Sequence, residues 1–562
     1  MFNIIEKKKH IKICGVLLLL ITTGLSIRLF FLSHSMPLTG DALDYFAYSH
    51  SVSVTNTLPI NWNLSNNGWP LLFSQIIKIF NLDSFENNIL LFRIVGCIIS
   101  SVTIFPMYLL CNLFFNKKIS LIGGALLIFE PRIILNSSSG LIEPLYILIG
   151  ILTLYFFLKN NQKLNYMSFV TAGVLSILRW EGIIIFPIMI ILFILKNPKK
   201  KKFGVKPILM TLIFLLTIFP LSYLNYVNTG SDGLIMPILN YGPGYIERYI
   251  INKNIEDKNE VGIDEYLLNS DEKIIYESYV RGEISTNDFK KQFSEISKEN
   301  NVVIILITNL FQNSFKLIGP VMIPTFIVYL PFSIFIIFKE KIYKKKNFNK
   351  WIIISMFLVF LLPALYAFSR NFNDVRYIFP VFPIFCLISL FVFDRFFVKK
   401  FILDKKFFCL ILLTIILPSF IFLQSKQNND IVEIEKYEIA KFLINEASGT
   451  NYSSITKYFK AASFETTWPN IQLTDDSGHI ISLTKKFDLE GYDTFEEFLY
   501  KNRINGLTHI TAEKTDSNLI INQIYNESEE YFYLEKVFDS TEKNMVSNVK
   551  IFKINYFKLD RK

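Results

Sequence analysis

The stretch KKKHIKICGVLLLLITTGLSIRLFFL, residues 7–32, decides the fold class, because lysines precede an apolar run of about 20 residues, enough to cross a bilayer. By the positive-inside rule the lysines stay in the cytoplasm, so the chain emerges on the outer or lumenal face. The run is long and lacks a clear small-x-small cleavage site, so we interpret it as a retained span rather than a signal peptide. Gly40-Asp41-Ala42-Leu43-Asp44-Tyr45 follows and places two carboxylates just outside the membrane.

The composition points in the same direction. The chain has 562 residues, of which 51% are hydrophobic, and a mean hydropathy of +0.36. Its net charge of +10 is concentrated in lysine clusters between apolar runs, as topology signals are, so we expect no nucleic-acid partner. The five cysteines all fall in or at the edges of apolar runs, which argues against disulfides and a cysteine metal site.

Hydropathy predicts eleven membrane spans. They cover approximately 11–32, 88–111, 119–135, 141–158, 164–178, 183–196, 207–226, 320–338, 351–368, 377–393 and 407–424. With this count every basic linker falls in the cytoplasm: Lys117-Lys118, Lys159 with Lys163, Lys196 to Lys206, Lys339 to Lys350, and Arg395 to Lys406. The alternation predicts a multi-pass membrane protein whose N-terminus is cytoplasmic.

The same count divides the chain into two domains. Residues 1–424 form a helical membrane domain with outer loops 33–87 and 227–319, and 425–562 form a small extracytoplasmic α/β domain. Within the outer loops, 41–54 and 69–81 have helical patterning, and we expect them to lie along the interface. The apolar stretch 302–317 is expected to be re-entrant or interfacial rather than a span. In the tail we expect helices at 433–446 and 494–502 and strands at 507–511, 531–538 and 549–557.

Four arginines lie at the outer ends of spans, against the usual charge bias: Arg132, Arg179, Arg370 and Arg376. Charges in such places often have a function, and the alternative is that they reach to lipid phosphates. Arg376 stands beside Arg370 and Asp374, and a guanidinium is the favoured fork for phosphate oxygens. Arg179 begins a tight turn, where it could hold phosphate or neutralise Glu181.

The outward carboxylates allow two interpretations. Asp41 and Asp44 share a helix face, so one could take a proton from an acceptor hydroxyl while the other holds a cation or a second hydroxyl. From the residues alone, the simpler interpretation is favoured, namely that Asp41 caps the interfacial helix. Glu143 lies just inside a span, which is costly unless the carboxylate is paired. Arg132 or Arg179 could be its partner in an ion pair that is either structural or functional.

The order of these features resembles the C-type superfamily of integral-membrane glycosyltransferases, and within it the branch of protein O-mannosyltransferases and aminoarabinose transferases. The resemblance covers about residues 1–400. Its motifs, in chain order, are Asp41, Gly68-Trp69-Pro70-Leu71-Leu72, Phe92-Arg93-Ile94, Pro131, Ser139-Gly140-Leu141-Ile142-Glu143-Pro144-Leu145, Leu178-Arg179-Trp180-Glu181-Gly182, Pro187, and Arg376-Tyr377 with Pro380 and Pro383.

The resemblance implies a polyprenyl- or dolichyl-phosphate sugar as donor and an outward Asp, here Asp41, as catalytic base. Family members often carry a second acidic residue directly after that Asp. Ala42 stands there in this chain, which leaves Asp44 as the nearest substitute. Glu143 matches an acidic position that implies a divalent metal, with Asp41 as a second ligand. Arg376 matches an arginine near the donor phosphate.

The expected function is therefore an inverting transfer of a hexose or pentose from a lipid phosphate to a protein, lipid or glycan acceptor. An oligosaccharyltransferase of the same superfamily would need Trp-Trp-Asp-Tyr-Gly in its outer domain, and the tail has a single tryptophan, Trp468. A lipid-linked glycan flippase or transporter predicts inverted repeats and charges at mid-membrane, whereas the charges here gather at the outer ends. A lipid-glycan polymerase stays open as a third alternative.

Overall fold

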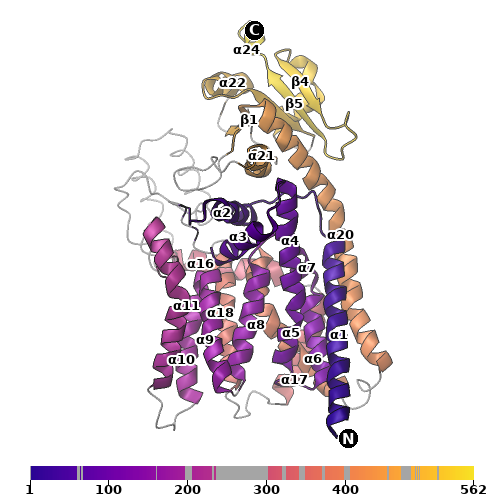
Figure 1. Cartoon of the computed structure of the whole chain (residues 1–562). Helices are drawn as coiled ribbons and strands as arrows, with labels where there is room; N and C mark the ends of the chain where they lie inside the picture. The colour runs from indigo at the N-terminus through magenta and orange to yellow at the C-terminus, as the bar shows by residue number, and fades with distance from the viewer. Residues whose placement is uncertain are drawn as a thin grey trace.

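A computed structural model shows a helical bundle below and a small mixed domain above (Figure 1). It describes the chain except residues 1, 60–61, 63, 65–66, 160, 197–204, 231–232, 234, 236–301, 319–323, 341–348, 370–373, 398–404, 452–454, 470–481, 488, 490–491, 493, 515–517 and 562.

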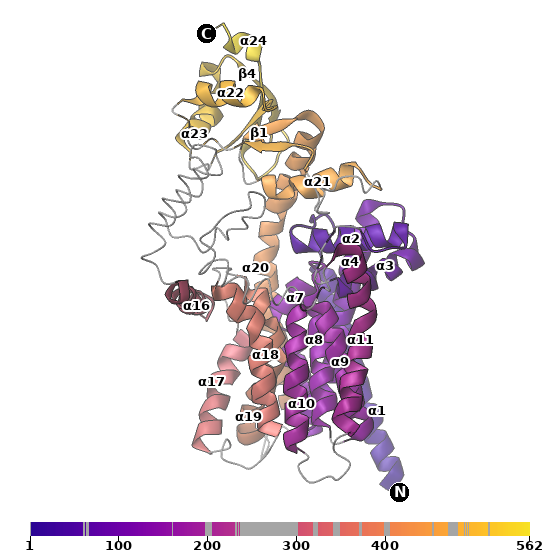
Figure 2. The ribbon, with the colours of Figure 1, turned by 90° about the vertical axis from the view of Figure 1, so that its left-hand side faces the viewer.

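The bundle consists of helices that run side by side in both views (Figures 1 and 2). They are α1 (Phe2–Phe30), α4 (Phe85–Val102), α5 (Ile104–Cys111), α6 (Lys117–Ile128), α7 (Pro131–Ser137), α8 (Glu143–Leu158), α9 (Gln162–Leu178), α10 (Ile185–Lys196), α11 (Val205–Thr229), α17 (Pro324–Lys339), α18 (Asn349–Ser369) and α19 (Phe382–Val392). Among these, α8 packs against α9 and α9 packs against α11.

Within the described part of the chain, six helices are long and apolar enough to cross a bilayer. The pair α6 and α7, bent by 55° at its break, would make a seventh. The other four predicted spans correspond to helices shorter than about 20 residues: α8, α9, α10 and α17 have 16, 17, 12 and 16 residues. A polytopic helical membrane protein is confirmed, and the count of eleven stays a prediction.

Two short helices lie across the upper end of the bundle, α2 (Asp41–Thr55) and α3 (Gly68–Phe80) (Figure 1). They coincide within a residue with the segments for which an interfacial position was predicted. Helix α16 (Val302–Ile318) lies beside the upper end of α18, against which it packs (Figure 2). This layer of short helices places the start of α2, and with it Asp41, at the upper end of the bundle, which we call its mouth.

A single helix of 42 residues, α20 (Lys405–Glu446), connects the bundle to the upper domain (Figure 1). At 1.5 Å per residue it is about 63 Å long. We predicted a span to 424 and a separate helix from 433, but residues 425–432 contain neither Gly nor Pro and the helix continues through them. The predicted domain boundary at 424/425 thus falls inside one helix.

The upper domain contains a five-stranded mixed sheet in the order β2-β1-β3-β5-β4. Its strands are β1 (Gly449–Asn451), β2 (Lys485–Phe487), β3 (His509–Glu513), β4 (Leu534–Asp539) and β5 (Val549–Ile554). The β1–β2 and β1–β3 pairs are parallel, and the β3–β5 and β4–β5 pairs are antiparallel. Its helices are α21 (Phe459–Thr466), α22 (Phe495–Arg503), α23 (Leu519–Asn526) and α24 (Tyr556–Leu559).

Candidate active site at the mouth of the bundle

Asp41 is the first residue of α2 and does not cap it. The N-cap position is taken by Gly40, which has a positive φ of 53° and makes no side-chain capping bond. The Asp41 carboxylate instead pairs with Arg376, with 2.7 Å between Oδ2 and Nη1. The capping interpretation, which the residues alone favoured, is therefore wrong. The carboxylate that begins α2 is directed to another part of the chain, 335 positions away in sequence.

Arg93 holds the loop that leads into α2. Its side chain on α4 is buried and donates hydrogen bonds to three backbone carbonyls, those of Ser33 (2.8 Å), Pro37 (3.2 Å) and Met36. A guanidinium has five N–H donors in a rigid fork, so one side chain can fix several turns of a loop. The sequence singled out Arg93 only as part of a motif, and the structure assigns it the positioning of the segment before Asp41.

Arg376 is also held by Asp374, its near neighbour in the sequence. It lies in the 3₁₀ helix η4 (Val375–Val381), whose N-cap is Asp374. Asp374 accepts a hydrogen bond from the Arg376 backbone N–H (2.9 Å), and its Oδ2 lies 2.9 Å from Arg376 Nε. Asp41 and Asp374 therefore orient the guanidinium between them. About half of the Asp41 side chain and a fifth of the Arg376 side chain stay exposed, so the pair is open to a ligand.

A second, buried ion-pair cluster lies below the Asp41–Arg376 pair. Arg179, at the C-terminal end of α9, pairs with Glu143 (3.4 Å) and with Glu181 (3.1 Å). All three side chains are at most 8% exposed. Burial lowers the pKa of Arg179, but Glu181 and Glu143 outweigh it and the net pKa rises. Of the two roles open to Arg179, neutralising Glu181 agrees with these contacts.

Tyr377 joins the two clusters. The Arg376 guanidinium lies 5.1 Å from the centroid of its ring, and that of Arg179 lies 5.6 Å away. Tyr45 on α2 is also part of the site. Burial raises the pKa of its hydroxyl, the charges of Asp41 and Glu143 raise it further, and Arg179 and Arg376 oppose them. Six side chains from α2, α8, the end of α9 and η4 therefore interact at the mouth of the bundle.

The glycines of the sequence motifs allow this convergence. Trp69 on α3 donates its indole N–H to the carbonyl of Gly140 (3.1 Å) and stacks on Phe92 of α4. Gly140 has a positive φ of 81°, and a Cβ there would lie 2.6 Å from the Phe92 ring. A Cβ on Gly68 would lie 2.7 Å from the Ile177 side chain of α9. Motifs far apart in sequence thus meet as one packed layer beneath α2.

The other predicted site residues have different positions. Arg132 on α7 lies with its guanidinium 6.0 Å from the ring of Phe422 on α20, and the described contacts do not join it to Asp41. Arg370 lies outside the described residues. Asp44 is half-buried one turn after Asp41, and its backbone N–H bonds to the Gly40 carbonyl (3.2 Å). Of the three predicted arginines that the structure describes, Arg376 and Arg179 lie at the site.

The carboxylates as described do not form a metal site. Asp41 is paired with Arg376 and Glu143 with Arg179. No group of three or more His, Cys, Asp or Glu side chains able to hold a metal ion is found among the described residues. Glu143 and Glu181 each keep one buried oxygen without a hydrogen-bond partner in the described part of the chain. A divalent metal held by Asp41 and Glu143 therefore stays a prediction, and no chemical step is assigned to it.

The upper domain contacts α2 from above. Trp468 follows α21 and donates its indole N–H to the carbonyl of Asp83 (3.0 Å). Its ring lies 4.0 Å from His50, 5.9 Å from Phe46 and 5.4 Å from Phe85, between ring centroids. Burial lowers the pKa of His50, which favours the neutral ring in this contact. The sequence analysis missed this contact because it joins segments about 420 positions apart.

Comparison with known proteins gives the fold. No protein-family model matches the sequence, and no curated protein matches it. The oligosaccharyltransferase of Archaeoglobus fulgidus, solved with Zn and sulfate, matches with a TM-score of 0.50 and 11% identity over 95% of this chain and 73% of that one. ArnT of Cupriavidus metallidurans, bound to undecaprenyl phosphate, matches with a TM-score of 0.46 and 11% identity over 96% of this chain and 98% of its own. The predicted resemblance to C-type membrane glycosyltransferases is confirmed at the level of the fold. This conclusion is based on the match to the Archaeoglobus fulgidus structure.

Proposed function

For a chain with the fold of membrane glycosyltransferases, we propose an inverting transfer of a sugar from a polyprenyl- or dolichyl-phosphate donor to a protein, lipid or glycan acceptor. The reaction takes place at the outer or lumenal membrane face, and Asp41 is its general base. A shared fold alone does not establish an activity, so the proposal rests on the site. Its main support is that Asp41, freed from any capping role, presents a half-exposed carboxylate beside an oriented arginine.

The chemistry needs few groups. A sugar attached to phosphate already has a good leaving group, so catalysis requires a base for the acceptor hydroxyl and positive charge for the departing phosphate. The acceptor oxygen attacks the anomeric carbon while its proton passes to an Asp41 oxygen. The bond from the anomeric carbon to the phosphate oxygen breaks, and the lipid phosphate leaves with the electron pair. A single displacement of this kind inverts the anomeric centre.

Arg376 is the arginine that we assign to the phosphate. Arg179 is buried and faces two carboxylates, so its charge is already compensated. Arg376 is partly exposed, and its guanidinium has five N–H donors, more than its contacts with Asp41 and Asp374 need. We assign the buried cluster of Glu143, Arg179 and Glu181 a positioning role, because it supports Tyr377 under the Arg376 guanidinium.

The experiment that tests this function is a transfer assay on the purified protein in proteoliposomes, with a panel of radiolabelled polyprenyl-phosphate hexoses and pentoses and with membrane extracts as acceptor source. We expect label to move from one donor to a glycosylated product, and Asp41→Asn protein to abolish the signal. The transporter alternative would instead be established if no product formed and if the wild type and Asp41→Asn moved intact lipid-linked sugar across the bilayer at the same rate.

A further inference from the structure

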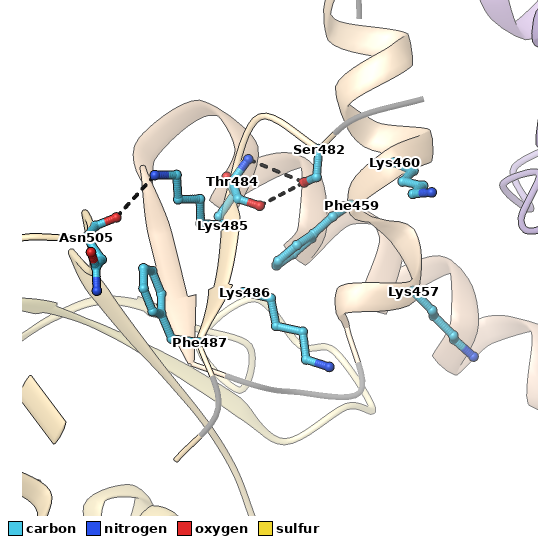
Figure 3. A pocket seen from close by; sticks show the side chains of 9 residues that line it. All are labelled: Lys457, Phe459, Lys460, Ser482, Thr484, Lys485, Lys486, Phe487 and Asn505. Carbon is cyan, nitrogen blue, oxygen red and sulfur yellow. Dashed lines mark hydrogen bonds between the residues drawn. The ribbon is translucent and has the colours of Figure 1, made fainter. Parts of the chain in front are cut away.

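A second site lies in the upper domain, away from the mouth of the bundle. A cavity of about 670 Å³ opens between β2, the 3₁₀ helix η6 (Thr456–Tyr458) and α21 (Figure 3). This volume lies within the range of about 300–1,000 Å³ of small-molecule sites. The cavity is lined by Lys457, Phe459, Lys460, Ser482, Thr484, Lys485, Lys486, Phe487 and Asn505.

The charge of this cavity differs from that of the domain around it. Residues 425–562 contain 22 Asp and Glu against 17 Lys and Arg, so the domain is acidic as a whole. The described residues that line the cavity include four lysines and no acidic side chain. A concave site that gathers one sign of charge raises the local concentration of ligands of the opposite sign. The cavity is therefore suited to an anionic ligand.

The lysines keep donors for such a ligand. Lys457 pairs with Glu433, which lies on α20 outside the lining, and Lys485 donates to the Asn505 carbonyl at 3.3 Å (Figure 3). An ammonium group has three N–H donors, so one contact leaves two available. Lys460 makes no ion pair with the residues that the structure describes. Charge-assisted hydrogen bonds from these groups are the strong ones for carboxylate or phosphate oxygens.

One wall of the cavity is fixed in place. Thr484 donates its hydroxyl to the Ala447 carbonyl at the end of α20 (2.7 Å), and Ser482 donates to the Thr484 carbonyl (2.9 Å). Parallel pairing with β1 then holds β2. The lining also includes the phenyl rings of Phe459 and Phe487 and the Ser482 hydroxyl, which is turned toward Thr484 (Figure 3). The lysines surround these groups, with Lys485 extended toward Asn505 and Lys460 toward the other side of the Phe459 ring. The cavity thus combines cations, a hydroxyl and aromatic surface on a fixed wall.

We propose that this cavity binds an anionic saccharide, whose carboxylate or phosphate groups contact the lysines and whose ring C–H groups pack on the phenylalanines. The negatively polarised face of an aromatic ring attracts such C–H groups. An acidic peptide is the weaker fit, because β2 is an edge strand of three residues and its lysines discourage strand addition. The proposal stands on the cavity alone and does not depend on the transfer reaction.

Isothermal titration calorimetry on the full-length protein in detergent micelles tests this site. The probes are trigalacturonate, the neutral trisaccharide maltotriose, inorganic phosphate and hexaglutamate. We expect trigalacturonate to bind most tightly, with an affinity that falls as salt rises. Lys460→Gln with Lys486→Gln should weaken it about tenfold or more, since two charge-assisted contacts are lost. These side chains lie at the surface, so the double variant is expected to fold.

The matched control is Lys501→Gln with Lys514→Gln, which removes two lysines from the same domain outside the cavity. It should bind trigalacturonate as the wild type does. The proposal is overturned if trigalacturonate does not bind, or if the cavity variant and the control behave alike. If maltotriose bound as tightly as trigalacturonate, the site would not recognise the negative charge of the ligand and the proposal would be wrong. Equal binding of phosphate would reduce the site to an anion site, and tighter binding of hexaglutamate would make it a peptide site.

Discussion

Asp41 and Arg376 form an ion pair whose energetics favour a functional role. With the carboxylate half exposed, such a pair contributes only about 0–1 kcal/mol to stability. Asp374 nevertheless orients Arg376, and Arg93 holds the segment that leads into α2. Because the ion pair itself adds little stability, we attribute this precise positioning to function.

The Asp41–Arg376 pair and the contacts of Arg93 could not be predicted from the sequence, because the partners are far apart along the chain. Asp374 lies two residues before Arg376, and the sequence placed these two side chains next to each other. For Asp41 and Arg376, the sequence could predict only that both face outward.

We predict that Arg376→Ala impairs use of the donor. Losing a charge-assisted contact to phosphate should cost about 1.5–3 kcal/mol of transition-state stabilisation. This corresponds to a fall in kcat/KM for the donor of roughly 10- to 150-fold. The control is Arg395→Ala, which removes a more exposed arginine that pairs with Glu340 and lies in a linker predicted to be cytoplasmic. Steady-state kinetics at varied donor concentration measures both. Equal kcat/KM for Arg376→Ala and wild type, in folded protein, would remove Arg376 from the donor site.

At the scale of elements, the predicted helices and strands agree with the observed ones where the element is long enough to show a sequence pattern. The helices α2 and α3 have apolar patterns of three or four turns and were predicted nearly to the residue. The strands β1 and β2 have three residues each, too few for an alternating pattern, and were missed. The continuity of α20 was missed because a polar stretch after a span was taken for a linker, although nothing in it breaks a helix.

We predict that Gly140→Ala is more destabilising than Gly230→Ala. Both glycines have a positive φ, 81° and 71°, so both substitutions cost about 1–2 kcal/mol of backbone strain. A Cβ at Gly230 meets nothing within 4 Å, whereas at Gly140 it meets the Phe92 ring at 2.6 Å. Overpacking should add about 1–3 kcal/mol at Gly140 alone. Thermal unfolding in detergent should show the larger fall in midpoint for Gly140→Ala, and equal falls would contradict the close packing beneath α2.

At the scale of the whole molecule, the upper domain and the bundle meet through α20 and through the Trp468 contact on α2. We predict that this contact weakens at acidic pH. The folded-state pKa of His50 is below its ordinary value, so the neutral ring's contribution to stability is complete above about pH 6.5 and decreases as pH falls below that value. His509 acts with the same sign, because burial and Lys553 lower its pKa to about 4.

The measurement is therefore made in a His509→Gln background. Between pH 7.5 and 5.5, the thermal midpoint should fall more with His50 present than in the His50→Gln double variant. Parallel pH profiles for the two proteins would show that protonation of His50 does not affect the contact.

We also predict that the N-terminus is inside and the upper domain outside. A cysteine introduced at Lys501 should react with an impermeant maleimide on intact cells, and one introduced at Lys350 only after permeabilisation. The unmodified chain is the control, because Cys14 and Cys409 are exposed on helices of the bundle. Labelling with the opposite pattern would reverse the topology and move Asp41 to the cytoplasmic side.

The central claim is that Asp41 is the base, and the turnover of Asp41→Asn tests it most directly. Asn keeps the size and an oxygen that can accept a hydrogen bond from Arg376, but it cannot take the acceptor proton. At saturating donor and acceptor, we predict a loss of about 10²–10⁴-fold in kcat. Asp44→Asn, one turn along the same helix, is the comparison and should lose less. Wild-type turnover by folded Asp41→Asn protein would contradict the account and move the base to Asp44 or Glu143.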